Sequence, residues 1–418
     1  PMCGSIPPVG RIALDFPRAE SASMGTVRVF VEQIRQPTAG GTNPVPALME
    51  MSVRWPSVLR VARPMHREDS IVTRYLLGGA IGAIVIALCG SGLSGPASAK
   101  DLVFATFNPP TTSTGQALTN SFERLVNEYS GGSLSPELHM RGSLCSEHNC
   151  VEQARLGNIH LTSISTGNIG AFGTTYDIAN LPYIFKDNAW AKKLSYGSFA
   201  TTLHERAESE MGLKVFALIP GGGFRHLSCN VRAIHGPQDL KGVKIRTTKS
   251  PMEFTLMKAW GAIPVPYDAS QIYNGMLTGV INGMYVQLPW QAVLKIHEVA
   301  EHFTLTGGAW GTNALLADLK WYQDESAEVR GVVDKLMADL QDEIFTYDAA
   351  WIEEGRKTLE KKAKVYTPTE AEMKVWREGA VQAWVDAKGT YDPQLARAAL
   401  GEQGLTDFIE VLEKAGAL

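Results

Sequence analysis

The chain has 418 residues, of which 44% are hydrophobic and 20% charged, a composition that excludes a disordered or collagen-like protein. Lysine and arginine number 39 against 43 aspartate and glutamate residues, so the net charge is -4. This acidic balance argues against a nucleic-acid-binding protein, because phosphate contacts require a basic excess. Five cysteines are too few for a disulfide-scaffolded mini-domain.

The N-terminal region consists of two segments. Residues 1–64 show no sustained hydrophobic period, which predicts a disordered or wrongly assigned extension. Residues 65–99 have the order of a secretory signal peptide: basic Arg67 and Arg74, an uncharged apolar run over 76–88, and an Ala-x-Ala site ending at Ala99. A membrane anchor is the alternative, but the apolar run is shorter than the about 20 residues that a span needs. We therefore expect cleavage after Ala99 and export to an oxidising compartment.

Strands and helices alternate in the next part of the chain. The helix at 113–130 is the best defined, because Leu118, Phe122 and Leu125 recur on one face and Gly131 ends it. The other patterns predict strands at 102–107, 134–140, 159–164 and 214–219, and helices at 146–156 and 187–210. This alternation indicates an α/β fold with a largely parallel sheet.

A second α/β set follows. We expect strands at 243–246 and 280–286, a helix at 268–277, and a helix opened by a capping box of Ser250 and Glu253. Helical spacing from Ser326 to about Ala363 predicts a helix of unusual length, which could bridge two lobes. Thr369 and Glu372 form the capping box of a later helix.

Two arginines are candidates for anion binding. Arg225 follows three glycines at 221–223, and Arg246 ends a predicted strand. Ligands of open α/β sheets lie beyond the carboxyl ends of strands. A guanidinium there offers a planar fork of donors that matches a carboxylate or sulfonate. A surface position or a structural ion pair is the alternative for each arginine.

Cys145 and Cys150 flank a short loop, and in an exported protein this spacing favours a disulfide. A metal site with His148 is the alternative, although three close ligands fit no common zinc spacing. Cys229 is expected to be a buried free thiol. His297 and His302 are five residues apart, which does not match a zinc-protease helix, and predicts an exposed helix end.

Motifs of several enzyme classes are missing from the sequence. It has no Gly-x-Ser-x-Gly elbow, no Gly-Lys pair of a phosphate-binding loop and no dinucleotide fingerprint. No nucleophile–base pair can be recognised either. The sequence therefore predicts a protein that is not an enzyme and that uses no cofactor and no metal.

Several segments in order resemble the substrate-binding proteins of TRAP transporters, the DctP family. The resemblance covers nearly all of residues 100–418 and is most specific at 237–246, which is similar to the family pattern "p-x-DLKGlKiR". Further matches lie in the opening helix with Ser130-Gly131-Gly132, in the "LPf" turn at 181–185, at Gly283, and around Thr367 to Trp376. Asn282 replaces the usual Asp of the "vDG" turn.

The resemblance implies an α/β, two-lobed periplasmic binding protein fold with a hinge and a long helix spanning both lobes. It places residues 100–222 plus about 310–350 in lobe I, and 223–309 plus about 351–418 in lobe II. It also implies that Arg246 is the main contact to a ligand carboxylate and Arg225 a secondary one. The other ligand contacts that it implies are Asn108, Ser165, Thr166, Asn168, Lys249, Tyr285, Gln287, Trp310 and Asn313.

The function implied is capture of a small organic anion, a carboxylate or sulfonate, in the periplasm and its delivery to the small and large membrane subunits of a TRAP transporter. The extra cation of Lys249 and the nearby aromatics would suit a compact acid, dianionic or aromatic. Two alternatives remain: an exported enzyme acting on a small organic acid, and a sensor receptor that binds ligand but signals.

Overall fold

The computed structural model describes residues 99–418. The predictions for residues 1–64 and for the signal peptide, apart from Ala99 itself, lie outside these residues. The strands pair in the order β2-β1-β3-β9-β4-β7-β5-β6, with β8 paired to β4 and β10 to β8. Their bounds are β1 Lys100–Ala105, β2 Leu134–His139, β3 Leu161–Ser165, β4 Leu213–Cys229, β5 Lys244–Thr247, β6 Ile263–Pro266, β7 Gly283–Gln287, β8 His302–Thr304, β9 Trp310–Asp318 and β10 Lys364–Tyr366.

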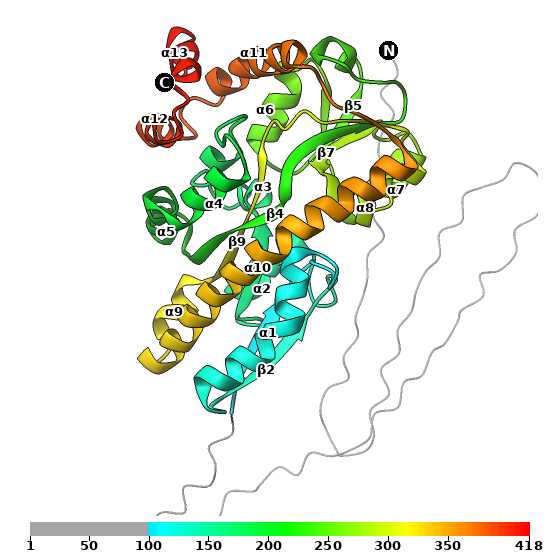
Figure 1. Ribbon diagram of the computed structural model, residues 1–418. Helices are drawn as coiled ribbons and strands as arrows, with labels where there is room; N and C mark the ends of the chain where they lie inside the picture. The colour runs from blue at the N-terminus through cyan, green and yellow to red at the C-terminus, as the bar shows by residue number, and fades with distance from the viewer. Residues whose placement is uncertain (1–98) are drawn as a thin grey trace, which may run out of the picture. The chain divides into compact units, whose positions relative to one another are not determined.

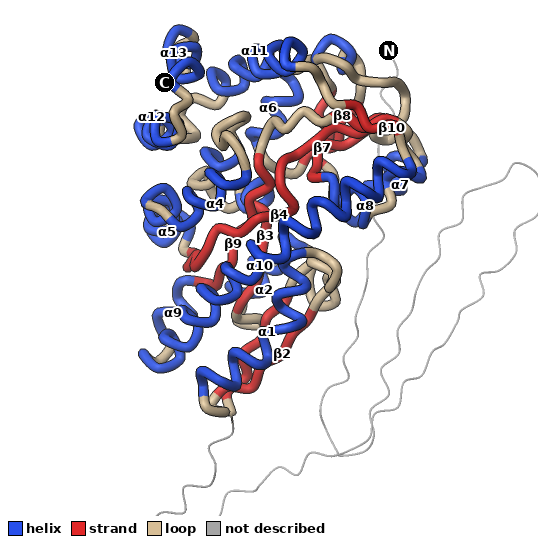
Figure 2. Tube along the Cα trace, in the orientation of Figure 1, coloured by secondary structure: helices blue, strands red, loops and turns tan. Residues whose placement is uncertain are grey.

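Helices cover this strand system on its outside, as Figure 2 shows with strands in red and helices in blue. Helix α1 has the predicted bounds, because Thr112 caps its start and Gly131 ends it in a left-handed conformation. The bounds are α1 Ser113–Ser130, α2 Glu147–Arg155, α3 Thr166–Ile169, α4 Asn188–Tyr196, α5 Ser198–Met211, α6 Pro251–Ala259, α7 Ile272–Leu277, α8 Leu288–Val293, α9 Leu319–Asp324, α10 Ala327–Lys362, α11 Glu370–Asp386, α12 Pro393–Glu402 and α13 Thr406–Lys414.

The sheet has two halves: strands β1, β2 and β3 form the first half, and strands β5, β6 and β7 form the second. The strands pair in parallel within each half, and the pairing is antiparallel where the halves join. The long strands β4 and β9 run antiparallel to each other and to their other partners. The prediction of a largely parallel sheet therefore holds for each half, whereas the two joining strands make the whole sheet mixed.

Strand β4 passes from one half to the other through an irregularity at the three glycines. Its pairing with β9 shifts register between Pro220 and Phe224, where Gly222 has φ 100° and Gly223 has φ 77°. A Cβ atom on Gly222 would lie 2.7 Å from the Cγ atom of Pro289. Only glycine fits this positive-φ, crowded position. The predicted strand at 214–219 was too short because these glycines resemble a strand end.

Helix α10 contains 36 residues and begins at the N-cap Ser326, whose side chain accepts a hydrogen bond from the backbone N–H of Val329. Leu336 and Leu340 pack with Leu118 of α1 in one hydrophobic cluster. At the other end, Leu359 joins the cluster around Phe303. Figure 1 shows α10 running diagonally along the molecule from α1 and α9 to α7 and α8. The prediction of a long helix spanning both halves is confirmed.

The C-terminal helices divide between the halves, which differs from the predicted lobe boundary. Helix α11 packs through Trp376 against Trp260 of α6. From Trp384 onward, however, the chain belongs to the core built around residues 151–218. There the indole Nε1 of Trp384 donates to the carbonyl of Pro182 at 2.9 Å, and Gln403 Nε2 donates to the carbonyl of Ile184 at 2.8 Å.

Three predicted helices differ in the structure. The helix at 187–210 is split by Gly197 into α4 and α5. The helix at 268–277 begins as a short 3₁₀ turn before α7. The predicted helix end near His297 is wrong, because His297 lies in a 3₁₀ turn and His302 in strand β8.

Candidate functional site

A cavity of about 60 Å³ lies between the two halves of the sheet. Strands β3, β4, β5 and β7 each contribute lining side chains, and so do the loop after β1 and helix α8. The predicted contacts that line it are Asn108, Ser165, Asn168, Arg225, Arg246, Gln287 and Asn313. The structure thus brings together side chains that are spread over most of the described chain.

Arg246 is buried in this cavity without a carboxylate partner. Its side chain is on β5, near the carboxyl end of the strand, and the residue is 4% exposed. Nε donates to the carbonyl of Tyr267 at 2.9 Å, and no carboxylate oxygen of the described residues lies within 4.0 Å of the guanidinium. Burial lowers the pKa of Arg246 from its ordinary value, but a guanidinium stays charged. Its terminal N–H groups can therefore bind an anion.

Arg225 is also buried, but it has an anionic partner. Its Nη2 lies 3.1 Å from Oε1 of Glu253, and the two side chains are 3% and 1% exposed. The other terminal nitrogen, Nη1, lies 3.4 Å from the carbonyl of Tyr285, to which it donates. A structural ion pair, the alternative considered for both arginines, therefore describes Arg225. Its charge is neutralised within the protein.

Glu253 has a different role from the one predicted. Ser250 Oγ accepts from the backbone N–H of Glu253 at 3.3 Å, as expected for an N-cap. The carboxylate of Glu253, however, accepts from the backbone N–H of Thr248 at 2.9 Å and pairs with Arg225. Glu253 is the third residue of α6, and its pairing with Arg225 of β4 depends on how these two elements pack in the fold.

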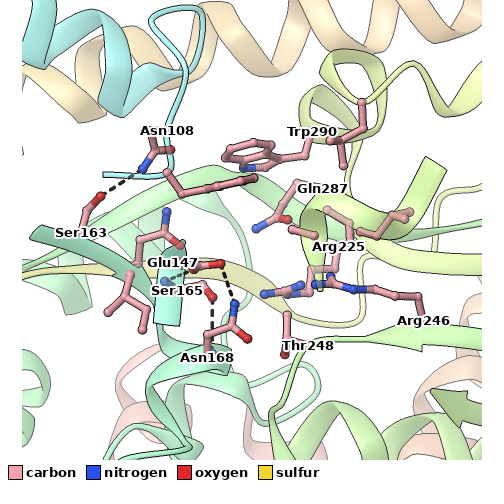
Figure 3. A pocket seen from close by; sticks show the side chains of 17 residues that line it. Asn108, Glu147, Ser163, Ser165, Asn168, Arg225, Arg246, Thr248, Gln287 and Trp290 are labelled. Carbon is pink, nitrogen blue, oxygen red and sulfur yellow. Dashed lines mark hydrogen bonds between the residues drawn. The ribbon is translucent and has the colours of Figure 1, made fainter. Parts of the chain in front are cut away.

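Glu147 lies on the side of the cavity opposite the two arginines (Figure 3). Its Oε1 accepts from the backbone N–H of Ser165 at 2.7 Å, and its Oε2 accepts from Asn168 Nδ2 at 2.6 Å. It is the first residue of α2, between Cys145 and Cys150, which form a disulfide in the structure. Glu147 was not among the ligand contacts predicted from the sequence, because its approach to the arginines depends on the fold.

Polar groups on the first half are held by their own hydrogen bonds. Asn108 Nδ2 donates to Thr106 Oγ1 at 2.9 Å and to Ser163 Oγ at 3.0 Å; Figure 3 shows the bond to Ser163. Ser165 lies on β3 like Ser163, and it pairs in register with Asn313 of β9. These groups have fixed orientations and can bind polar parts of a ligand.

Four predicted contacts lie outside the lining. Thr166 Oγ1 lies 3.0 Å from both Asn180 Oδ1 and the Thr312 carbonyl. Trp310 Nε1 donates to Asn188 Oδ1 at 3.0 Å, and Tyr285 is buried against Trp260. The side chain of Lys249 is exposed, and only its backbone N–H reaches the site, donating to Asn168 Oδ1 at 3.3 Å. We therefore leave Thr166, Lys249, Tyr285 and Trp310 out of the proposed ligand contacts.

An aromatic pair that was not predicted from the sequence forms one wall of the cavity. Phe107 and Trp290 both line the cavity, with ring centroids 6.1 Å apart and planes inclined by 19°. Trp290 packs in turn against Trp351 of α10. Beside this wall, Gln287 lies over Gly311, where a Cβ atom would be 1.6 Å from its Nε2. The missing side chain of Gly311 thus makes room for the amide of Gln287.

The described residues contain no group of three His, Cys, Asp or Glu side chains able to hold a metal ion. The alternative metal site at Cys145, His148 and Cys150 is not formed, because the two sulfurs are bonded to each other. Cys229 is a buried free thiol, as predicted. No helix within residues 99–418 is long and apolar enough to cross a membrane.

Comparison with known proteins identifies the family. Residues 104–389 match the family model DctP, "Bacterial extracellular solute-binding protein, family 7". The chain belongs to this family. Members of family 7 are solute-binding receptors rather than enzymes, so the fold class and the solute-binding function expected from the sequence are confirmed.

Curated relatives in family 7 cover different shares of the chain. The C4-dicarboxylate-binding periplasmic protein DctP of Rhodobacter capsulatus is 28% identical over 275 residues, which are 65% of this chain and 80% of that protein. The 2,3-diketo-L-gulonate-binding periplasmic protein YiaO of Escherichia coli is 29% identical over 191 residues, 45% of this chain and 57% of that protein.

Solved structures share the two-lobed fold of family 7. The sugar acid binding protein DctPAm of Advenella mimigardefordensis, in complex with galactonate, has a TM-score of 0.68 at 20% identity and covers 75% of this chain and 99% of its own. A TRAP periplasmic solute binding protein of Shewanella oneidensis with bound succinate also has a TM-score of 0.68, at 19% identity, and covers 72% and 99%.

Proposed function

We propose that this protein captures a small organic acid by its carboxylate in the cavity and delivers it to the membrane subunits of a TRAP transporter. The observation that carries the proposal is the buried guanidinium of Arg246, which has no carboxylate oxygen of the described residues within 4.0 Å. A buried charge without a partner is costly, and a bound carboxylate would compensate it. Relatives named for binding C4-dicarboxylates and 2,3-diketo-L-gulonate support an organic acid.

Contact between the halves supports ligand capture by closure. Gly167 of α3 lies so close to the segment after β5 that a Cβ atom would be 2.7 Å from Thr248 Oγ1. Asn168 accepts a hydrogen bond from the backbone N–H of Lys249 across the same contact. A ligand that bridges both halves would favour the closed arrangement, and exclusion of water would strengthen its pairing with Arg246.

Export to the periplasm is part of the proposal. Strand β1 begins at Lys100, the residue that directly follows the predicted cleavage site at Ala99. The disulfide between Cys145 and Cys150 suits an oxidising compartment. We propose further that the bound acid is released unchanged, so no turnover is expected.

The proposal is tested by ligand binding to the purified protein. A thermal-unfolding screen against organic acids should find a ligand that stabilises the protein by about 2.7 kcal/mol at 100 times its Kd. The amide of the same acid is the control, since it lacks the negative charge. Equal stabilisation by acid and amide would contradict the role of the carboxylate, and product formation from the bound acid would favour the enzyme alternative.

A further inference from the structure

The charges around the cavity restrict the class of acid. Two cations, Arg225 and Arg246, are opposed by three carboxylates: Glu253, Glu147 and Asp268, which acts on Arg246 electrostatically. None of the three lies within 4.0 Å of the guanidinium of Arg246. Glu253 neutralises Arg225 directly at 3.1 Å, whereas Glu147 makes no ion pair with Arg246 and lies across the cavity from it. One ligand carboxylate can therefore be matched by Arg246, and no second unmatched cation lines the cavity within the described residues.

Lys249 does not supply the missing cation. Its side chain is exposed and is not part of the lining. The expectation of a dianionic ligand, which relied on Lys249, therefore has no support in the geometry.

Glu147 offers acceptors to the ligand. Each of its oxygens accepts one hydrogen bond from the protein, from Ser165 and from Asn168. An ionised carboxylate has about four lone-pair sites, so acceptor positions remain. A hydroxyl or ammonium group can donate to them, whereas a second ligand carboxylate would meet a like charge.

We propose that the ligand is a monocarboxylate that carries a hydroxyl or ammonium group at some distance from its carboxylate, and that dicarboxylates are disfavoured. This rests on the proposed function of the same cavity. The carboxylate binds Arg246 and the donor group binds Glu147. The carbon chain between them lies against the stacked rings of Phe107 and Trp290. Glu147 is thus a specificity-determining residue.

The first test compares acids with the same carbon skeleton by calorimetry. Butyrate, 4-hydroxybutyrate, 4-aminobutyrate and succinate differ only at the end away from one carboxylate, and the same design extends to chains of about three to six carbons. The best ligand should be a hydroxy or amino monocarboxylate, bound roughly tenfold or more tightly than its dicarboxylate counterpart, because a hydrogen bond to a charged group replaces a repulsion. A dicarboxylate as the tightest ligand would overturn the inference and leave the proposed function intact.

The second test changes the charge of the cavity with Glu147→Gln. The hydroxy or amino acid should lose roughly tenfold or more in affinity, and the dicarboxylate of the same length should gain affinity. Glu152→Gln is the control, since it makes the same exchange at an exposed position of the same helix. The melting temperature without ligand shows whether each variant is folded. If a variant does not fold, the ranking of the acids by the wild-type protein still tests the inference. Unchanged ligand preference in folded Glu147→Gln overturns the inference, whereas binding of no acid by the wild type refutes the proposed function itself.

Discussion

Asp348 of helix α10 gives a quantitative prediction about the junction between the halves. The residue is 5% exposed, and its Oδ1 accepts hydrogen bonds from Ser113 Oγ at 2.9 Å and from the backbone N–H of Gly222 at 3.0 Å. It therefore links α10 both to α1 and to the irregularity in β4. Burial raises the pKa of Asp348 from 3.8 to about 7, although these two hydrogen bonds act in the opposite direction.

The raised pKa determines how this group contributes to stability. Between about pH 4 and pH 7 the folded protein keeps a proton on Asp348 that the unfolded chain releases. The contribution of this carboxyl group to the free energy of unfolding therefore falls as pH rises through that range. A shift of about 3 pKa units, at 1.36 kcal/mol each, corresponds to about 4 kcal/mol above pH 7.

Asp348→Asn removes this effect while keeping the hydrogen bonds, because the amide oxygen can accept from both Ser113 and Gly222. We expect the variant to be more stable than the wild type at about pH 8, by up to about 4 kcal/mol, and the difference to shrink toward pH 4. Urea unfolding of both proteins over this range measures it. The pKa of Asp177 is also raised to about 7, but its contribution to the free energy of unfolding is the same in both proteins and cancels in their difference.

The control for this prediction is Glu354→Gln, at an exposed position of the same helix whose side chain makes no hydrogen bond or ion pair with the described residues. It measures the effect of removing one surface carboxylate from α10, against which the effect of Asp348→Asn is compared. If the stability difference between Asp348→Asn and the wild type is the same at about pH 4 and about pH 8, Asp348 is ionised throughout and the reasoning fails.

Three further predictions concern the site. Glu253→Gln should lower the free energy of unfolding by about 3–5 kcal/mol, since it leaves the buried charge of Arg225 without its partner; a loss below about 1 kcal/mol in urea unfolding would contradict this. Gly311→Ala should weaken ligand binding about tenfold or more by displacing Gln287, as calorimetry can show, because the new Cβ would lie 1.6 Å from its Nε2; full affinity in a folded variant would mean that Gln287 is dispensable. Alkylation of the purified protein should label Cys145 and Cys150 only after reduction, and equal labelling without reductant would show that the disulfide does not form.

Local patterns allowed many elements to be predicted from the sequence. Helix α1 and the capping box of Thr369 and Glu372 follow from short-range spacing, and α10 follows from a long uninterrupted periodicity. Strand β4 was cut short because glycine within a strand and glycine at a strand end look alike in sequence. The packing of the chain after Trp384 against the first half depends on long-range contacts, which periodicity does not contain.

The candidate site was predicted in part. Arg225 and Arg246 were recognised because each stands next to a distinctive backbone feature, a glycine run and a strand end. Their different environments could not be predicted, since Glu253 reaches only Arg225 through the arrangement of β4 and α6. Glu147 and the aromatic wall were missed for the same reason, because they approach the arginines only in the folded protein.

The central claim is that Arg246 holds the carboxylate of the ligand. Calorimetry of Arg246→Ala with the best acid from the binding screen tests it most directly. We expect a loss of at least about 2 kcal/mol, about thirtyfold in Kd. The unliganded variant should stay folded and lose only about 1 kcal/mol of stability, because the hydrogen bond of Arg246 to the Tyr267 carbonyl is lost but no ion pair within 4.0 Å is broken. An unchanged Kd for the acid would contradict the claim.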